Sequence, residues 1–113
     1  MSLAEAVRFV SRAEKTVAAY EVKERITSDA ELFHVLAAAM EFDDAFGANW
    51  DALIDSLRDV PPKQEDTVTL MIHDAEVLWT TAPRVAGRLV EIWLLVADDM
   101  STEGVEYRLV FVW

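Results

Sequence analysis

Three stretches of the chain have the apolar pattern of β-strands. Thr67–His73 is the clearest, because it is rich in β-branched residues and almost continuously apolar. Such a run is typical of a strand that is buried on both faces, as in a parallel sheet. Lys15–Ile26 contains a shorter apolar run and predicts the first strand, and Tyr107–Trp113 predicts the last.

After Ser28 the apolar residues recur at intervals of three and four, which predicts a helix to about Met40. Glu31 stands three residues after Ser28. This is the spacing of a capping box, in which two side chains satisfy free backbone N–H groups at the start of a helix. An acidic link, Glu41–Asp44, follows the helix.

A second helix is predicted from Asn49 to about Asp59. Asn is preferred just before a helix, because its side-chain oxygen can accept from the free N–H groups of the first turn. Gly47 gives the backbone freedom to turn sharply just before this cap. Pro61-Pro62 ends the helix, since proline has no N–H to donate and its ring clashes with the preceding turn.

The second half of the chain predicts two more helices. A short one opens at Asp74, and a longer one runs to about Asp99 with Pro83 in its first turn and Thr80-Thr81 as its cap. Gly87 inside the longer helix costs roughly 1 kcal/mol relative to alanine. We therefore expect another part of the chain to pack closely against Gly87.

The predicted element order is β-α-α-β-α-α-β within one α/β domain, residues 1–113. Residues 1–14 form an N-terminal extension, in which Ala4–Glu14 is either a short amphipathic helix or an extended lead-in. Each pair of successive strands is separated by a helical crossover. This favours parallel pairing with right-handed connections.

Composition narrows the possible functions. The chain has no cysteine, which excludes disulfides and fits a reducing cytosol. Its net charge of −11 argues against nucleic acid or an anionic membrane as a direct partner, because both need basic patches. The same charge is consistent with a basic protein partner drawn in by long-range attraction, and equally with simple solubility.

Nothing in the sequence predicts export or membrane insertion. Met1–Val10 lacks the basic start of a signal peptide, and the longest apolar run, Ile92–Ala97, is too short to cross a bilayer. We therefore expect a cytoplasmic protein with no membrane partner.

The helix predicted after Asn49 has two distinct faces. Its apolar stripe consists of Trp50, Leu53, Ile54 and Leu57. Asp51 and Asp55, four residues apart, lie one above the other on another face. Like charges at this spacing disfavour a helix by roughly 0.2–0.5 kcal/mol, and only Asp51, in the first turn, regains part of this from the helix dipole. Residues that break a local rule in this way are often functional, so the pair could belong to a binding site. A solvated acidic face is the simpler interpretation.

The segment Gly47–Leu57 closely resembles the central segment of the barstar family, small acidic inhibitors of barnase-type guanyl-specific ribonucleases, in a pattern that starts at Phe46. The shared pattern is Phe/Tyr-Gly-x-Asn-hydrophobic-Asp-Ala-Leu-x-Asp. The resemblance is strong from Lys15 to about Arg58 and weaker, at the level of element order, through Trp113. It implies a barstar-like α/β fold, a small three-stranded parallel sheet covered by helices.

The resemblance also implies a function. The helix and the loop before it would block a nuclease active site, with Asp55 in place of an RNA phosphate and Asp51 paired with a second basic group. Asn49 would cap the helix and fix the loop, while Trp50 and Ile54 would supply apolar contact. The implied partner is a basic, extracellular-type ribonuclease, and the chain would be an immunity protein rather than an enzyme, without cofactor or metal. The alternative is a barstar-fold binding module for a different, non-nuclease basic partner.

Several positions depart from the family pattern. Ala45 and Ile54 stand where the family often has aromatic residues, and Arg58 puts a positive charge at the edge of the expected contact face. A further family carboxylate, on the last long helix, has two candidates here, Glu91 and Asp98. These departures favour a partner that differs from the best-known nuclease, or a barstar-fold protein whose partner is not a nuclease, because a few such changes can shift specificity widely.

Other chemistries have weaker support. His34 and His73 match no catalytic motif, and His73 is either a proton-transfer site or a boundary residue. Asp51 and Asp55 could act as an acid–base pair only if burial separated their pKa values. The link Glu41–Asp44 matches no calcium-loop spacing. Exposed aromatic residues are compatible with a homodimer, but nothing in their spacing requires one.

Overall fold

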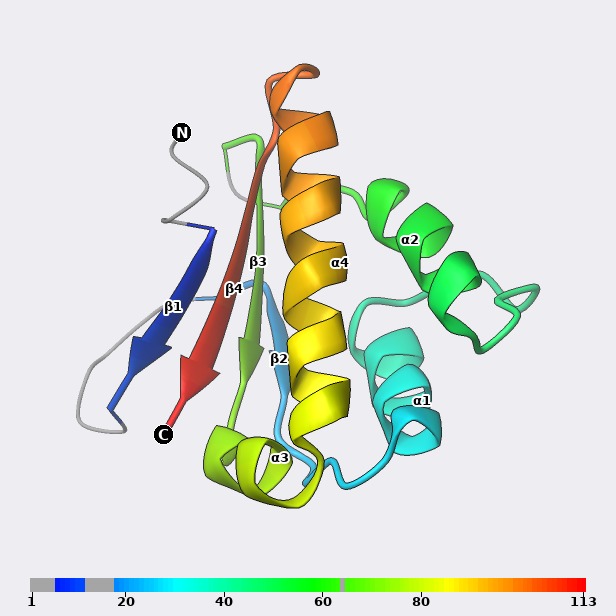
Figure 1. The fold of residues 1–113 in the computed structure, drawn as a ribbon. Coiled ribbons are helices and arrows are strands. Elements are labelled where there is room, and N and C mark those ends of the chain that lie inside the picture. The colour runs from blue at the N-terminus through cyan, green and yellow to red at the C-terminus, as the bar shows by residue number, and fades with distance from the viewer. Residues whose placement is uncertain (1–5, 12–17, 64) are drawn as a thin grey trace.

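The computed structural model describes residues 6–11, 18–63 and 65–113. Figure 1 shows the course of the chain. The elements are β1 (Val7–Val10), β2 (Tyr20–Val22), α1 (Asp29–Ala39), α2 (Trp50–Arg58), β3 (Thr67–Ile72), α3 (Ala75–Thr81), α4 (Pro83–Ser101) and β4 (Glu106–Val112). The four predicted helices and the predicted α/β class are confirmed.

The strands form one parallel sheet in the order β1-β4-β3-β2. The prediction of three strands is therefore wrong by one, because β1 pairs with β4 at the edge of the sheet. Val7 lies opposite Leu109, and Val10 lies opposite Val112. Of the two structures predicted for Ala4–Glu14, the described residues 7–10 adopt the extended one.

The pairing of β1 satisfies the backbone of β4. The N–H of Leu109 donates to the carbonyl of Ala6 at 2.7 Å, and that of Trp113 donates to Val10 at 2.8 Å. Without β1, this side of β4 would be an open edge, which proteins commonly cover. The short run from Val7 to Val10 fits a helical or an extended pattern equally well, so the neighbouring strand decides its structure.

The second strand is shorter than predicted. β2 comprises Tyr20–Val22, whereas the prediction was Lys15–Ile26, whose first residues lie outside the described part of the chain. Tyr20 and Val22 are buried, and Glu21 between them is exposed. Beyond the last paired residue of β2, the chain turns toward α1.

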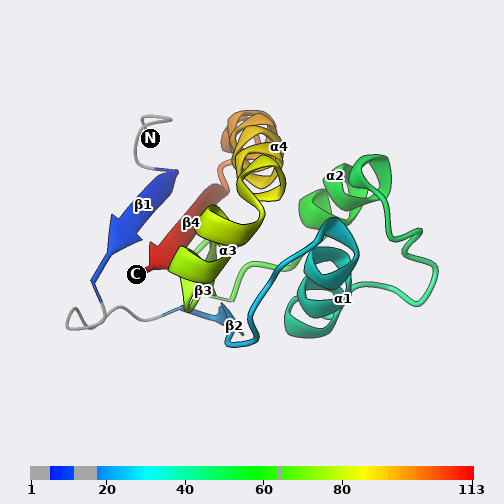
Figure 2. The same ribbon diagram turned by 60° about the horizontal axis from the view of Figure 1, so that its bottom comes forward.

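All the helices lie on one face of the sheet, as Figures 1 and 2 show. α4 runs back along the strands, and α1 and α2 lie beyond it on the side of β2 (Figure 1). The rings of Trp93 on α4 and Tyr107 on β4 are fully buried, with centroids 5.6 Å apart. α4 therefore joins the sheet to the layer that contains α2.

Two predictions about α4 need correction. Thr80-Thr81 belongs to the end of α3, and the hydroxyl of Thr80 donates to the carbonyl of Glu76 at 2.7 Å, so these threonines do not cap α4. α4 begins directly with Pro83, as predicted. A Cβ atom added at Gly87 would meet no atom within 4 Å, so the expected close packing is absent there.

Candidate functional site

The chain leaves α1 through a backbone motif that starts the acidic link. The N–H of Phe42 donates to the carbonyl of Ala37 at 3.0 Å, and Glu41 between them has a left-handed conformation with φ +56°. This pattern commonly ends helices and usually has glycine in the left-handed position. The N–H of Ala45 then donates to the carboxylate of Asp43 at 2.7 Å, which closes the next turn.

Asn49 caps α2, as predicted. Its side-chain oxygen accepts from the N–H of Ala52 at 2.8 Å, and its backbone is extended. The side-chain amide also donates to the carbonyl of Gly47 at 3.3 Å. Asn49 thus connects the first turn of α2 to the turn at Gly47, which follows the link.

The turn before this cap differs from the prediction. Ala48, with φ +50°, adopts the left-handed conformation, and Gly47 does not. Gly47 instead leaves room for Asn49, because a Cβ atom there would lie in tight contact, 3.2 Å from the side-chain nitrogen of Asn49. The sequence pointed to Gly47 as the turning residue, but the left-handed conformation and its strain fall on the next residue, Ala48.

The two faces of α2 are clearly separated. Leu53 and Leu57 are fully buried in the core. Asp51 and Asp55 are exposed, and within the described parts of the chain neither carboxylate has a hydrogen-bond or ion-pair partner. Two unpaired carboxylates therefore point to solvent from a helix whose other side is firmly packed.

Trp50 and Ile54 lie half-buried at the border of these two faces. The ring of Trp50 meets that of Phe33 on α1 edge to face, with centroids 4.9 Å apart. Phe42 in the link and Phe46 two residues after it also pack together, with ring centroids 5.0 Å apart. Much of this aromatic surface supports the link from beneath and is not presented to solvent.

Two tyrosines hold the C-terminal end of α2 against the sheet. The hydroxyl of Tyr107 donates to the carbonyl of Leu57 at 2.5 Å, and that of Tyr20 donates to Pro61 at 2.6 Å. Burial raises the pKa of Tyr107 to about 12, with smaller contributions from Tyr20 and Asp59. Both phenols stay protonated at neutral pH and keep these bonds.

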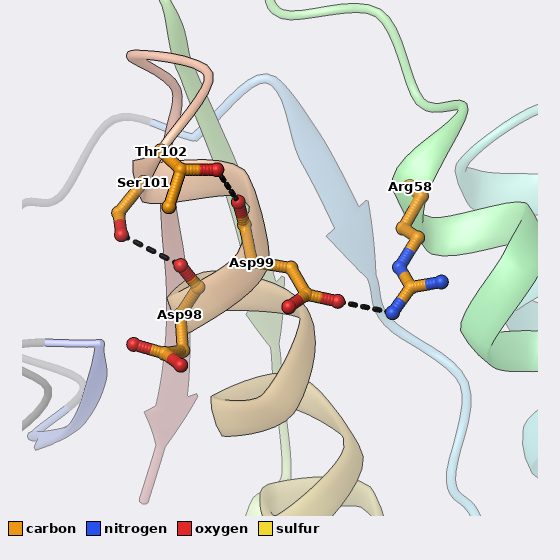
Figure 3. Close-up of polar contacts among 5 residues, drawn as sticks. All are labelled: Arg58, Asp98, Asp99, Ser101 and Thr102. Carbon is orange, nitrogen blue, oxygen red and sulfur yellow. Dashed lines mark hydrogen bonds and ion pairs between the residues drawn. The ribbon is translucent and has the colours of Figure 1, made fainter.

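An ion pair joins the end of α2 to α4. Figure 3 shows Arg58 reaching from α2 to the carboxylate of Asp99, while the carboxylate of Asp98 points away. Glu91, further back on α4, pairs with Arg88 at 3.4 Å. Of the acidic residues on α4, Asp99 is thus the one brought to α2. Neither Glu91 nor Asp98, the two candidates from the sequence, pairs with a residue of α2 among the described residues.

A hollow of about 320 Å³ lies between the link and the C-terminal half of α2. Its lining comprises Met40, Glu41, Phe42, Asp43, Ser56, Asp59 and Val60. Glu41 at its rim pairs with Lys63 at 3.3 Å, and the ammonium group of Lys63 also sits 4.6 Å from the centre of the Tyr20 ring. Lys63 therefore neutralises Glu41, and the carboxylates of Asp43 and Asp59 in the lining extend the acidic surface from α2 toward the link.

Three other features of the described residues bear on function: metal ligation, the partner of His73 and the length and hydropathy of the helices. In residues 6–11, 18–63 and 65–113, no group of three or more His, Cys, Asp or Glu side chains could hold a metal ion. His73, directly after β3, has its Nε2 atom 3.1 Å from the carboxylate of Glu21 on the neighbouring strand β2. Among the described helices, none combines the length and hydropathy needed to cross a bilayer.

Comparison with known families matches most of the chain to a family model. The model of the family described as "Barstar (barnase inhibitor)" matches residues 17–112, which include α2 and the link but leave out β1. The search of curated proteins finds no match to this chain.

Proposed function

The chain belongs to the barstar family, and from this premise we propose that it inhibits a basic guanyl-specific ribonuclease of the barnase type. The acidic link and α2 would cover the active site of the nuclease. The chain would act in the cytoplasm as an immunity protein, protecting the RNA of the cell that makes the nuclease. It would work by occlusion, without catalysis, cofactor or metal.

The observation that carries this proposal is the pair Asp51 and Asp55. Both are exposed, and they lie one turn apart on a helix whose register is held by buried Leu53 and Leu57. Because the helix is held on its other side, these carboxylates need little ordering when a partner binds. A basic cleft that binds RNA phosphates can accept them in the same way.

Each proposed contact residue has a distinct part. Asp55 takes the place of a phosphate and accepts charge-assisted hydrogen bonds from basic groups of the nuclease, which are among the stronger kinds. Asp51 pairs with a second basic group. Asn49 fixes the link to the helix, and Trp50 and Ile54 offer the parts of their side chains that the core leaves uncovered.

Titration calorimetry with a catalytically disabled barnase-type ribonuclease tests this proposal. We expect tight binding that weakens as salt is added, because exposed charges are screened. Asp55→Asn keeps the shape of the side chain but removes its charge, and should weaken binding at least about 100-fold, the effect of losing one or two charge-assisted bonds.

The matched control is Glu76→Gln, which removes an equal charge from an exposed position on α3. It should change binding less than about threefold, since it alters only the long-range field. Equal binding by wild type and Asp55→Asn would refute phosphate mimicry. No binding by the wild type at low salt would refute nuclease inhibition and favour a different basic partner.

A further inference from the structure

Arg58 places a positive charge at the end of an acidic stripe on α2. Asp51, Asp55 and Arg58 stand at positions i, i+4 and i+7 of α2, so their side chains follow one another along the same side of the helix. The stripe therefore has the charge order negative, negative, positive. A basic partner that covers the first two residues will lie close to the third.

Arg58 also controls a carboxylate on another helix. Its guanidinium pairs with Asp99 in the last turn of α4, as Figure 3 shows. The side chains of Arg58 and Asp99 are 39% and 46% exposed, so this pair lies at the surface, and such exposed pairs contribute little to fold stability. Its main effect is on charge, because it neutralises the acidic residue that α4 brings to α2.

We infer that Arg58 determines which basic partners this chain accepts, an inference that rests on the proposed function. By pairing with Asp99, it withholds a third carboxylate from the contact face. A partner with a basic group opposite this corner gains nothing from Asp99. The partner that fits best has basic groups opposite Asp51 and Asp55 and a neutral or acidic group opposite Arg58.

Four proteins test this inference by calorimetry against the disabled barnase-type ribonuclease: wild type, Arg58→Ala, Asp99→Asn and the double variant. Arg58→Ala frees Asp99 and should bind about tenfold more tightly. Asp99→Asn leaves Arg58 unneutralised and should bind about tenfold more weakly. The double variant has no charge at either position and should bind within about threefold of wild type.

Arg88→Ala is the matched control. Arg88 is also an exposed arginine that pairs with a carboxylate, that of Glu91. It stands 11 residues before Asp99, which is about 16 Å along α4. Arg88→Ala should change affinity less than about threefold. The difference between Arg58→Ala and Arg88→Ala should shrink at high salt, because it arises from charge.

The outcomes separate this inference from the proposed function. If wild type binds and Asp55→Asn does not, yet Arg58→Ala binds no more tightly than Arg88→Ala, the role of Arg58 is refuted and nuclease inhibition stands. If none of the four proteins binds, both fail. Melting temperatures within about 3 °C of wild type would show that the variants differ in charge and not in folding.

Discussion

α2 with its acidic link, and the edge strand β1 with its aromatic neighbours, expose opposite chemistry to solvent. At α2 the exposed residues are charged, the two carboxylates of Asp51 and Asp55 and the guanidinium of Arg58, and the ring of Trp50 turns toward α1. At β1 it is aromatic residues that are exposed, with Phe9 at 58% and Trp113 at 44% of their surface. The two regions lie at opposite ends of the molecule (Figure 1).

The difference shows that exposure alone does not identify a site. Phe9 stacks on Phe111 with ring centroids 5.2 Å apart and lies 5.8 Å from Trp79, so its ring helps to attach β1 to the sheet. The carboxylates of Asp51 and Asp55 attach nothing within the described residues. We therefore expect changes at β1 to alter stability and changes on the outer side of α2 to alter binding.

The largest effect that we predict is at the aromatic neighbours of β1. Phe111 is fully buried between Phe9 and Trp79, so Phe111→Ala should lower the free energy of unfolding by about 3–5 kcal/mol. Urea denaturation measures this loss. The folded fraction should still bind the nuclease as wild type does, since α2 is unchanged.

Phe9→Ala is the companion to that variant. Because more than half of the Phe9 side chain is exposed, the expected cost is only about 1 kcal/mol. The loss in free energy of unfolding could instead be as large as that of Phe111→Ala and depend on protein concentration. That result would show that a second copy of the chain covers this edge. The contrast between the two regions would then fail.

The second prediction concerns the anchor of α2. Tyr107 has a pKa of about 12 in the folded protein, raised from 10.0 mainly by burial. The unfolded chain therefore loses this proton first as the pH rises. Stability from this difference is fully present below pH 10 and is lost between pH 10 and 12, by on the order of 2 kcal/mol.

Urea denaturation at several pH values between 8 and 12 tests the role of Tyr107. Tyr107→Phe should be less stable at pH 8 by about 1 kcal/mol, because the bond to the carbonyl of Leu57 is lost. It should also lose most of the alkaline decrease in stability. If the decrease persisted unchanged, Tyr20, whose pKa burial also raises, would be its source.

A third prediction tests the start of α2. Asn49→Ala removes the cap of the helix and should cost about 1 kcal/mol of stability. It should also weaken nuclease binding, because Asn49 connects the link to the helix that carries Asp51. Asn49→Asp is the control, since an aspartate can make the same cap, and it should restore most of the stability.

The smallest predicted effect lies on α4, between the two regions. Gly87→Ala adds a methyl group where no atom lies within 4 Å, so it should stabilise the protein by roughly 0.5–1 kcal/mol. Binding should not change. A loss of stability measured by thermal denaturation would mean that Gly87 faces something beyond the described residues.

Local sequence determined much of α1 and α2. Ser28 accepts from the N–H of Glu31 as the capping box predicts, although the carboxylate of Glu31 reaches the N–H of Thr27 instead of that of Ser28. Asn49 likewise caps α2. These features depend on residues within a few positions of one another, so the chain specifies them before any tertiary contact forms.

The short strands and the ion-pair partner of Arg58 required the tertiary structure. β1 forms because β4 offers it an unpaired edge, and its own four residues have no clear preference. Asp98 and Asp99 are adjacent on one helix, and only the packing of α4 beside α2 selects Asp99 as the partner of Arg58. The spacing of residues along one helix does not predict which side of that helix packs against a second helix.

The sequence by itself thus determined the family, the order of the helices and the pair Asp51 and Asp55, since all of these depend on neighbouring residues and their periodicity. The tertiary structure alone decided that β1 completes the sheet, that Ala48 bears the strain expected at Gly47, and that Arg58 is neutralised from α4. Each of these depends on contacts or space between segments that are distant in the chain, or on the exact backbone path.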